Sequence, residues 1–175
     1  MEQTLLKNGQ TAIIREANES DAIEIKNIVN SVASEKKYVV LERSREDWDE
    51  AIREIKNRES LIIVAQVNGK TVGMAHLVRG KFKKNRHIGF LGILILKKFR
   101  IIGIGTAMMN YIMEWTKKSE DLEKISLTVF ATNIPAINLY HKFRFINEGI
   151  CKKQYKIEGD YIDEIIMGKF LTLPG

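Results

Sequence analysis

The sequence predicts an α/β fold, built on a mixed β-sheet with helices on both faces. Two features predict this class. An apolar run that ends at Leu96 is followed by a glycine-bearing turn, a helical segment and another strand-like run, and this order implies a parallel crossover. Asn68-Gly69 lies between two further apolar runs and is a strong signal for an antiparallel hairpin. The sheet is therefore expected to contain both kinds of pairing.

The first sixty residues are expected to hold one short strand and two helices. Residues 11–15 are a strand candidate, and residues 21–33 carry apolar side chains at helical spacing. Residues 34–43 lack such a period and are expected to form a loop. Ser44 followed by Asp47 resembles a capping box, which predicts a second helix directly after it.

Three strands are expected in the central part of the chain. Residues 61–65 are all apolar and predict a buried strand, and residues 71–78 return from the turn at Asn68-Gly69. Another turn is expected over residues 80–85, and a long strand over residues 87–96.

The C-terminal part is expected to alternate helices and strands. A helix runs from Gly103 to about residue 118, with its apolar residues on one face, and a strand covers residues 122–130. Asn133 can cap a further helix. Two strands, over residues 145–153 and 161–171, complete the expected order.

The composition predicts one globular domain over residues 1–175. The chain is 45% hydrophobic and 29% charged, which suits a single core. No apolar run approaches the ~20 residues needed to cross a bilayer. The first residues lack the apolar core of a secretory signal. We therefore expect a cytoplasmic protein without a membrane partner.

The sequence favours neither an internal disulfide nor a metal site. Cys151 is the only cysteine, which leaves it without an intramolecular partner. The three histidines, His76, His87 and His141, are not spaced as a metal-binding pair.

The positive charge suits an anionic partner. The formal net charge is +6. One predicted turn contains five of the basic residues: Arg79, Lys81, Lys83, Lys84 and Arg86. Such a cluster is typical of a solvated hairpin tip, and a nucleic-acid contact is the alternative. Apart from Phe82, the turn lacks the aromatic residues of a single-strand binder, which disfavours nucleic acid.

The turn after Leu96 has the features of a phosphate site. Gly103 and Gly105 lack a Cβ, so backbone N–H groups there can approach a ligand closely. The helix expected to begin at this point adds unpaired N–H donors and a partial positive charge. A strand, a glycine turn and a helix start together predict binding of a phosphate-type anion.

Two motifs resemble the GNAT superfamily of N-acetyltransferases. The turn matches the R/Q-x-x-G-x-G/A motif of that family as Arg100-Ile101-Ile102-Gly103-Ile104-Gly105. The later helix matches N-x-x-A-x-x-L-Y-x-x-x-G-F through Asn133, Ala136, Leu139, Tyr140 and Phe145, with Arg144 in place of the usual glycine. The order β-α-α-β-β-β-α-β-α-β-β also fits, so the resemblance implies a GNAT-like mixed, mostly antiparallel sheet.

The resemblance implies acetyl transfer from acetyl-CoA to a primary amine, by direct attack in a ternary complex. The diphosphate would lie on the glycine turn, and the pantetheine arm would pair with the backbone of the preceding strand. The implied cofactor-binding residues are Ile93, Leu94, Ile95, Arg100, Ile101, Ile102, Gly103, Ile104, Gly105, Thr106 and Asn133. Tyr140 matches the family tyrosine that reaches the sulfur and is the implied proton donor to the leaving thiolate.

No carboxylate stands where members of this family carry a general base. Thr128 and Gly89 occupy the two positions at which different members have glutamate. Since a free alkyl amine has a pKa of about 10.4, and an α-amine about 7.7–8.0, desolvation or another base must remove the proton. The remaining candidates for a base or relay are His76, His87 and Glu148.

The acceptor is expected beside the loop of residues 34–43, the second helix and the last two strands. A protein or peptide N-terminus, an amino-acid-like compound and a small polyamine all remain open. Two other classes also remain: a GNAT-fold protein that binds CoA without transfer, and a basic nucleic-acid-binding domain. The last strand could pair with a second subunit, which leaves a homodimer open.

Overall fold

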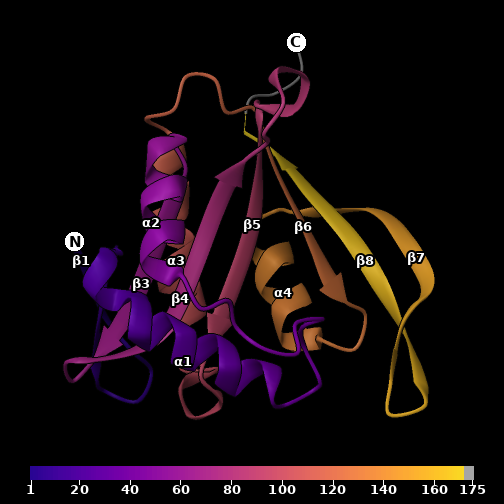
Figure 1. Cartoon of the computed structure of the whole chain (residues 1–175), viewed down its shortest axis with the longest axis horizontal. Coiled ribbons are helices and arrows are strands. Elements are labelled where there is room, and N and C mark those ends of the chain that lie inside the picture. Colours follow the sequence, from indigo (N-terminus) through magenta and orange to yellow (C-terminus); the bar gives the residue numbers. More distant parts are fainter. Residues whose placement is uncertain (172–175) are drawn as a thin grey trace.

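The computed structural model describes residues 1–171, in which one sheet carries helices on either side (Figure 1). The strands are β1 (Glu2–Leu5), β2 (Thr11–Glu16), β3 (Leu61–Val67), β4 (Lys70–Arg79), β5 (Ile88–Ile95), β6 (Lys124–Phe130), β7 (Ile146–Ile157) and β8 (Asp160–Phe170). The helices are α1 (Ala22–Ala33), α2 (Trp48–Asn57), α3 (Ile104–Thr116) and α4 (Ile134–Lys142), with 3₁₀ turns η1 (Glu19–Asp21), η2 (Lys83–Asn85) and η3 (Lys97–Phe99).

The strand order confirms the mixed, mostly antiparallel sheet. In the described residues the strands lie in the order β1-β2-β3-β4-β5-β6-β8-β7. β5 and β6 are parallel and joined through α3, as the predicted crossover requires. The other neighbouring pairs of this sheet are antiparallel.

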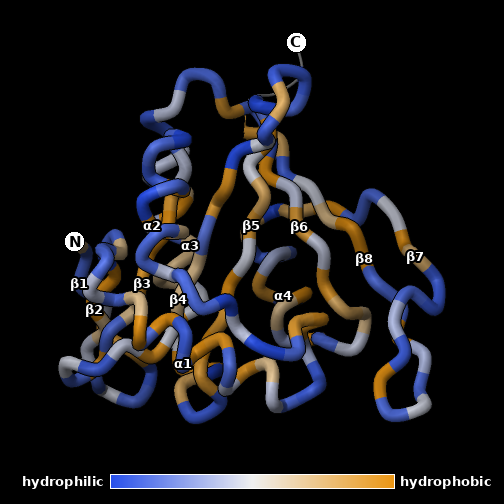
Figure 2. Tube along the Cα trace, viewed as in Figure 1, coloured by the Kyte–Doolittle hydropathy of each residue, from blue (hydrophilic) through white to orange (hydrophobic). Residues whose placement is uncertain are grey.

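The helices form two layers, which explains why the central strands are apolar throughout. Ile62 and Val64 of β3 pack with α1 and α2, whereas Leu61 and Ile63 pack with α3 and α4. A strand covered on both faces needs apolar residues at successive positions. Figure 2 shows hydrophobic residues along β3 and mostly hydrophilic residues along α2, whose outer side faces solvent.

Most element predictions are confirmed, and two need correction. Asn68 and Gly69 have φ angles of 50° and 75°, which fit the expected two-residue turn between β3 and β4. β1 was not expected from the sequence; it pairs antiparallel with β2. The capping box at Ser44 is wrong, because α2 begins after Asp47 and Ser44 Oγ instead accepts a 2.6 Å hydrogen bond from Trp48 Nε1.

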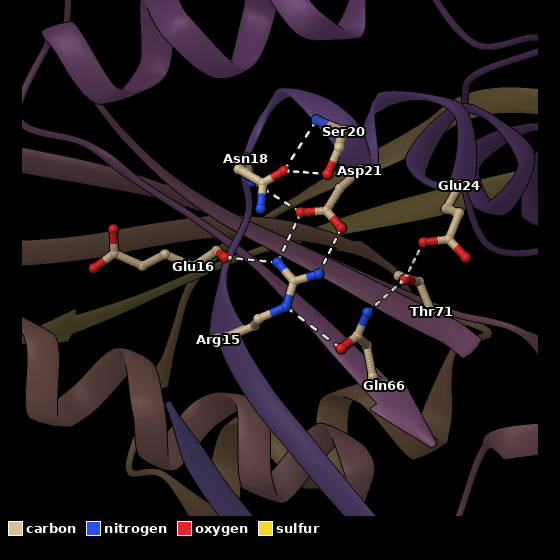
Figure 3. Close-up of polar contacts among 8 residues, drawn as sticks. All are labelled: Arg15, Glu16, Asn18, Ser20, Asp21, Glu24, Gln66 and Thr71. Atoms are coloured by element: carbon tan, nitrogen blue, oxygen red, sulfur yellow. Dashed lines mark hydrogen bonds and ion pairs between the residues drawn. The ribbon is translucent and has the colours of Figure 1, made fainter. Parts of the chain in front are cut away.

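A polar network fixes the start of α1 on the sheet (Figure 3). Arg15 donates to both carboxylate oxygens of Asp21 at 2.8 and 2.7 Å, and its Nε donates to Gln66 Oε1 at 3.4 Å. Asp21 is 3% exposed and also accepts from the backbone N–H of Asn18 at 2.8 Å. The bidentate pair therefore ties β2 to the first turn before α1.

The last strand, which the sequence left open to pairing with a second subunit, does not lie at an edge of the sheet. β8 lies between β6 and β7, so its hydrogen-bonding groups are largely used within the chain. β7, rather than the last strand, is the edge at this end of the sheet. None of the helices within residues 1–171 has the length and apolar character that crossing a membrane requires.

Candidate active site

The backbones of β5 and β6 separate part-way along the two strands, and this separation is called the cleft. The two strands pair only at their beginnings, from Ile88 opposite Lys124 to Phe90 opposite Ser126. Beyond Phe90, β5 continues to Ile95 while bonded to β4 alone, so the edge of β5 that faces β6 has no strand partner. Figure 1 shows the two strands diverging, with α4 beside the opening. An extended ligand could pair with this free edge.

The predicted pantetheine-binding residues lie on this free edge. Ile93, Leu94 and Ile95 form the last part of β5 and are partly exposed. Ile93 and Ile95 pack toward α3 and α4, and Leu94 packs toward α1 and α2. Their side chains therefore fill the two layers, which leaves their backbone groups to face the cleft.

The glycine turn presents a run of unpaired amides. Within residues 1–171, the N–H groups from Ile101 to Thr106 donate no backbone or side-chain hydrogen bond. Gly103 is the N-cap of α3 with φ of 110°, and Ile101 also has a positive φ, 66°. A β-branched residue in this region is strained, and such strain is typical of ligand-binding turns. The turn thus offers donors and a helix N-terminus to an anion.

Arg100 uses its side chain to hold the turn in place. Its two Nη atoms donate to Glu35 at 2.8 and 2.5 Å, and its Nε donates to the carbonyl oxygen of Ile95 at 2.8 Å. The guanidinium also lies 5.0 Å from the ring centre of Tyr38. Both residues belong to the loop after α1, so Arg100 connects the predicted acceptor loop to the predicted cofactor turn. Its guanidinium is engaged by the protein rather than free for a phosphate.

Asn133 and Tyr140 lie at the two ends of α4. The Asn133 side chain accepts a hydrogen bond from the N–H of Ala136 at 3.3 Å, which confirms its capping role. Tyr140 is 6% exposed, and burial raises its pKa to about 12. Its hydroxyl makes no hydrogen bond to another described residue. The phenol therefore stays protonated at neutral pH and has a free donor.

Arg144 adopts the conformation for which the family uses glycine. Its φ is 63°, its N–H donates to the carbonyl of His141 at 2.9 Å, and the N–H of Phe145 donates to that of Tyr140 at 3.1 Å. These two bonds form a Schellman motif. The motif persists with arginine at the left-handed position, and it holds the last turn of α4 that carries Tyr140.

His76 lies beside the point where the cleft opens. It is directly opposite Gly92, two residues beyond the last pair of β5 and β6. A Cβ on Gly92 would lie 2.5 Å from His76 Cε1, so the missing side chain makes room for the ring. Burial lowers the pKa of His76 below its ordinary value of 6.5, which leaves the imidazole neutral at pH 7.

The other proposed bases are less suitably placed. His87 precedes β5 at the closed end of the cleft, where its carbonyl accepts from the N–H groups of Glu123 and Lys124. Glu148 forms a 2.7 Å ion pair with Lys124 at the same end. Of the three candidates, His76 is therefore the one whose partner residue on β5, Gly92, lies beyond the last pair of β5 and β6.

Phe130, Tyr155 and Glu164 form a cluster at the open end of β6. The rings of Phe130 and Tyr155 are 5.0 Å apart, and Tyr155 Oη donates to Glu164 Oε1 at 2.9 Å. Glu164 is directly opposite Phe130 in the sheet and is 9% exposed. Burial and the contact with Glu164 raise the pKa of Tyr155. The sequence indicated an acidic final hairpin but not that Glu164 would be its buried carboxylate.

Two of the three expected acceptor elements, the loop after α1 and the final hairpin, contact each other, whereas α2 packs against α1 and β3. Lys36, in the loop after α1, forms a 3.2 Å ion pair with Glu158 at the turn between β7 and β8. The loop and the final hairpin therefore approach each other at this point. Within the described residues, no three His, Cys, Asp or Glu side chains gather as a metal site would need.

Comparison with known proteins agrees with this geometry. A sequence model described as the Acetyltransferase (GNAT) family matches residues 25–145. The chain belongs to the GNAT acetyltransferase family. The matched region runs from α1 to the end of the α4 motif and so contains the cleft, the glycine turn and Tyr140. Membership places the protein among the acyltransferases.

Individual relatives from this GNAT family are similar in sequence and in fold. An L-amino acid N-acetyltransferase, AaaT, from Escherichia coli is 29% identical over 70% of this chain and 74% of its own. An N-alpha-acetyltransferase from Sulfurisphaera tokodaii is 31% identical over 59% of this chain and 67% of its own. The crystal structure of a GNAT-family acetyltransferase from Streptococcus pneumoniae has a TM-score of 0.85 at 29% identity, covering 92% of this chain and 99% of its own.

One structural neighbour was solved with its cofactor. The structure of yncA, a putative acetyltransferase from Salmonella typhimurium with acetyl-CoA, has a TM-score of 0.86 and covers 94% of this chain and 96% of its own. At 16% identity, this likeness shows a shared fold.

Proposed function

We propose that residues 1–175 form one catalytic domain that transfers the acetyl group of acetyl-CoA to a primary amine, by direct attack in a ternary complex. The observation that carries the proposal is the run of unpaired amides from Ile101 to Thr106, which continues the free edge of β5. A diphosphate and an extended pantetheine arm need these two features in this order.

The cofactor-binding residues act mainly through their backbone. The amides of Ile101, Ile102, Gly103, Ile104, Gly105 and Thr106 would hold the diphosphate, and the edge at Ile93, Leu94 and Ile95 would hold the arm. Arg100 fixes the turn by its contacts with Glu35 and the Ile95 carbonyl. Asn133 sets the start of α4. Acetyl-CoA supplies an acetyl group activated as a thioester.

His76 is the proposed proton acceptor for the attacking amine. Its pKa is below 6.5, so at pH 7 the ring is neutral and can take a proton directly or through water. It lies opposite Gly92, at the level where β5 leaves β6. His76 would thus take the role of the glutamate that other family members carry at the positions of Gly89 or Thr128.

Tyr140 is the proposed donor to the departing sulfur. A phenol with a pKa of about 12 is more than three units less acidic than a thiol, which has a pKa of about 8.5. Tyr140 would therefore stabilise the thiolate mainly by a hydrogen bond, and full proton transfer would be uphill. Such a bond to a charged group is worth about 1.5–3 kcal/mol.

The acceptor we propose is the α-amine of an amino-acid-like compound or of a peptide N-terminus. Two carboxylates of the final hairpin contact lysines: Asp163 pairs with Lys152, and Glu158 forms a weaker, exposed pair with Lys36. A polyamine would need several free carboxylates, whereas one buried carboxylate, Glu164, suits a single cationic group. The lower pKa of an α-amine, about 7.7–8.0, also matches a weak base such as His76.

Replacement of Tyr140 by Phe tests the proposed transfer. Because none of the hydrogen bonds of the described residues involves this hydroxyl, Y140F should leave the unfolding midpoint in urea nearly unchanged while lowering kcat about 10- to 100-fold. Transfer to amino acids and short peptides can be followed by release of free thiol. Tyr111→Phe, on the outer part of α3, is the control. Unchanged turnover in Y140F, or binding of acetyl-CoA without any turnover in the wild type, would contradict the proposal.

A further inference from the structure

A basic hollow lies at the end of the sheet opposite the glycine turn. It has a volume of about 230 Å³ and is lined by Arg58, Arg79, Gly80, Lys81 and Arg86. These residues come from the α2–β3 connection, the end of β4 and the turn between β4 and β5, at the top of Figure 1. β5 separates this end from Ile95 by about 23 Å, at 3.3 Å per residue. The hollow is therefore distinct from the proposed acetyl-CoA site.

Arg79 is buried in the wall of this hollow without a counter-charge. It is 5% exposed, and Nη2 donates to Ser119 Oγ. Its Nε and Nη1 have no hydrogen-bond partner among the described residues, and no carboxylate within that part of the chain lies at ion-pair distance. A buried guanidinium that lacks an acceptor is strongly disfavoured. An anion would satisfy this unpaired group.

The other cations of the hollow are exposed and largely free. Arg86 forms a 3.1 Å pair with Glu59, but both side chains are more than half exposed, so the pair is weak and exchangeable. Arg58 and Lys81 are exposed and form no ion pair with a described residue. A second hollow beside Arg79 contains carboxylates, from Glu59, Glu120 and Asp121, whereas the lining of the first contains none.

The turn that carries two of these cations is held in a fixed shape. Gly80 N–H donates to the Ile88 carbonyl at 3.0 Å, and Phe82 N–H donates to Asn85 Oδ1 at 3.0 Å. A Cβ on Gly80 would lie 2.2 Å from the Asn85 carbonyl oxygen, so the close turn depends on glycine. The hydrogen-bonded backbone of this turn therefore holds Lys81 and Arg86 near Arg79.

We infer that this hollow binds a phosphate-type anion, such as inorganic phosphate, a phosphate monoester or a diphosphate. Three arginines line this one small volume, and planar guanidinium groups give multiply hydrogen-bonded recognition of phosphate oxygens. The volume of about 230 Å³ suits such a small ion. The site is independent of the proposed transfer reaction.

Calorimetric titration with inorganic phosphate and with pyrophosphate tests this inference. The titrations are done with the whole protein at saturating CoA, so that the amides of the glycine turn are occupied. The wild type should bind one anion. The double variant R58Q/R86Q should weaken binding by at least about tenfold, because each arginine contributes charged hydrogen bonds. The control K70Q/K142Q removes the same charge from distant exposed sites and should bind as the wild type does.

The substitution Arg79→Met tests whether the bound anion interacts with Arg79 or whether Arg79 only supports the fold. If the anion satisfies Arg79, phosphate should raise the unfolding midpoint of the wild type and not that of R79M. Three results would overturn the inference: no binding at 50 mM phosphate, equal binding by R58Q/R86Q and the wild type, or equal stabilisation of R79M. Steeply salt-dependent binding of generic RNA that phosphate does not displace would also overturn it in favour of a nucleic-acid surface.

Discussion

Replacement of His76 by Gln tests the proposed proton acceptor most directly. The ring lies in the space left by Gly92, and glutamine has a similar length but no titratable nitrogen. General-base catalysis contributes typically 10²- to 10⁴-fold, so H76Q should lower kcat about 100-fold or more at pH 7. Because burial lowers the pKa of His76 below 6.5, most of the wild-type protein is in the active neutral form at that pH. The full loss is therefore expected under ordinary assay conditions.

The pH profile separates a base from a merely structural histidine. Wild-type kcat should fall as pH drops through the pKa of His76, since a protonated imidazole accepts no proton, and H76Q should lack this limb. The limb should stay at the same pH for acceptor amines of different pKa. His87→Gln, at the closed end of the cleft, is the matched control. Equal turnover and an identical acidic limb in H76Q would refute the assignment.

Gly92→Ala approaches the same point by a different perturbation. The new Cβ would lie 2.5 Å from Cε1 and 2.7 Å from Nε2 of His76, so the ring must move. Overpacking of this kind costs about 1–3 kcal/mol of stability. Turnover measured on the folded fraction should fall as it does in H76Q. Normal turnover in G92A would show that the position of the ring is not required.

Three further predictions concern residues that support the fold around the site. Gly103→Ala places a side chain at φ of 110° and should raise the Kd for acetyl-CoA about tenfold in calorimetry, because the turn must shift. Arg144→Gly should raise the free energy of unfolding in urea by about 1 kcal/mol, since glycine adopts φ of 63° without strain. Asp21→Ala should lower the free energy of unfolding by about 2–4 kcal/mol at pH 7. Burial opposes ionisation of Asp21, but hydrogen bonds from Arg15 and the Asn18 N–H outweigh it and lower its pKa below 3.8, so this difference should shrink as pH falls below about 4.

The parts of the site that the sequence predicted are those whose chemistry lies in local spacing. A helix start with two glycines specifies free amides by itself, and the structure has them unpaired from Ile101 to Thr106. Asn133 three residues before Ala136 specifies a cap in the same way. The pairing of the pantetheine arm with the backbone of β5 was implied only by the family resemblance. The sequence of one strand does not indicate where a neighbouring strand stops pairing with it.

The parts that the sequence did not predict depend on distant residues meeting. Glu35 lies far before Arg100 in the chain, and nothing in either neighbourhood indicates that the two would pair. His76 gains its position from Gly92 only through the register of β4 and β5. The burial of Arg79 is likewise invisible in a turn that resembles a solvated cluster of charges.

Arg144 shows how a departure from a motif can be misjudged from sequence. Arginine stands where the family has glycine, and a non-glycine residue in the left-handed conformation is strained. The structure keeps both hydrogen bonds of the Schellman motif and places arginine in the left-handed conformation. The cost of that conformation, about 1–2 kcal/mol, is small beside the packing of α4 through Ile137 and Tyr140. A local penalty of this size lowers stability without moving Tyr140, so the substitution by itself gives no reason to expect a loss of catalysis.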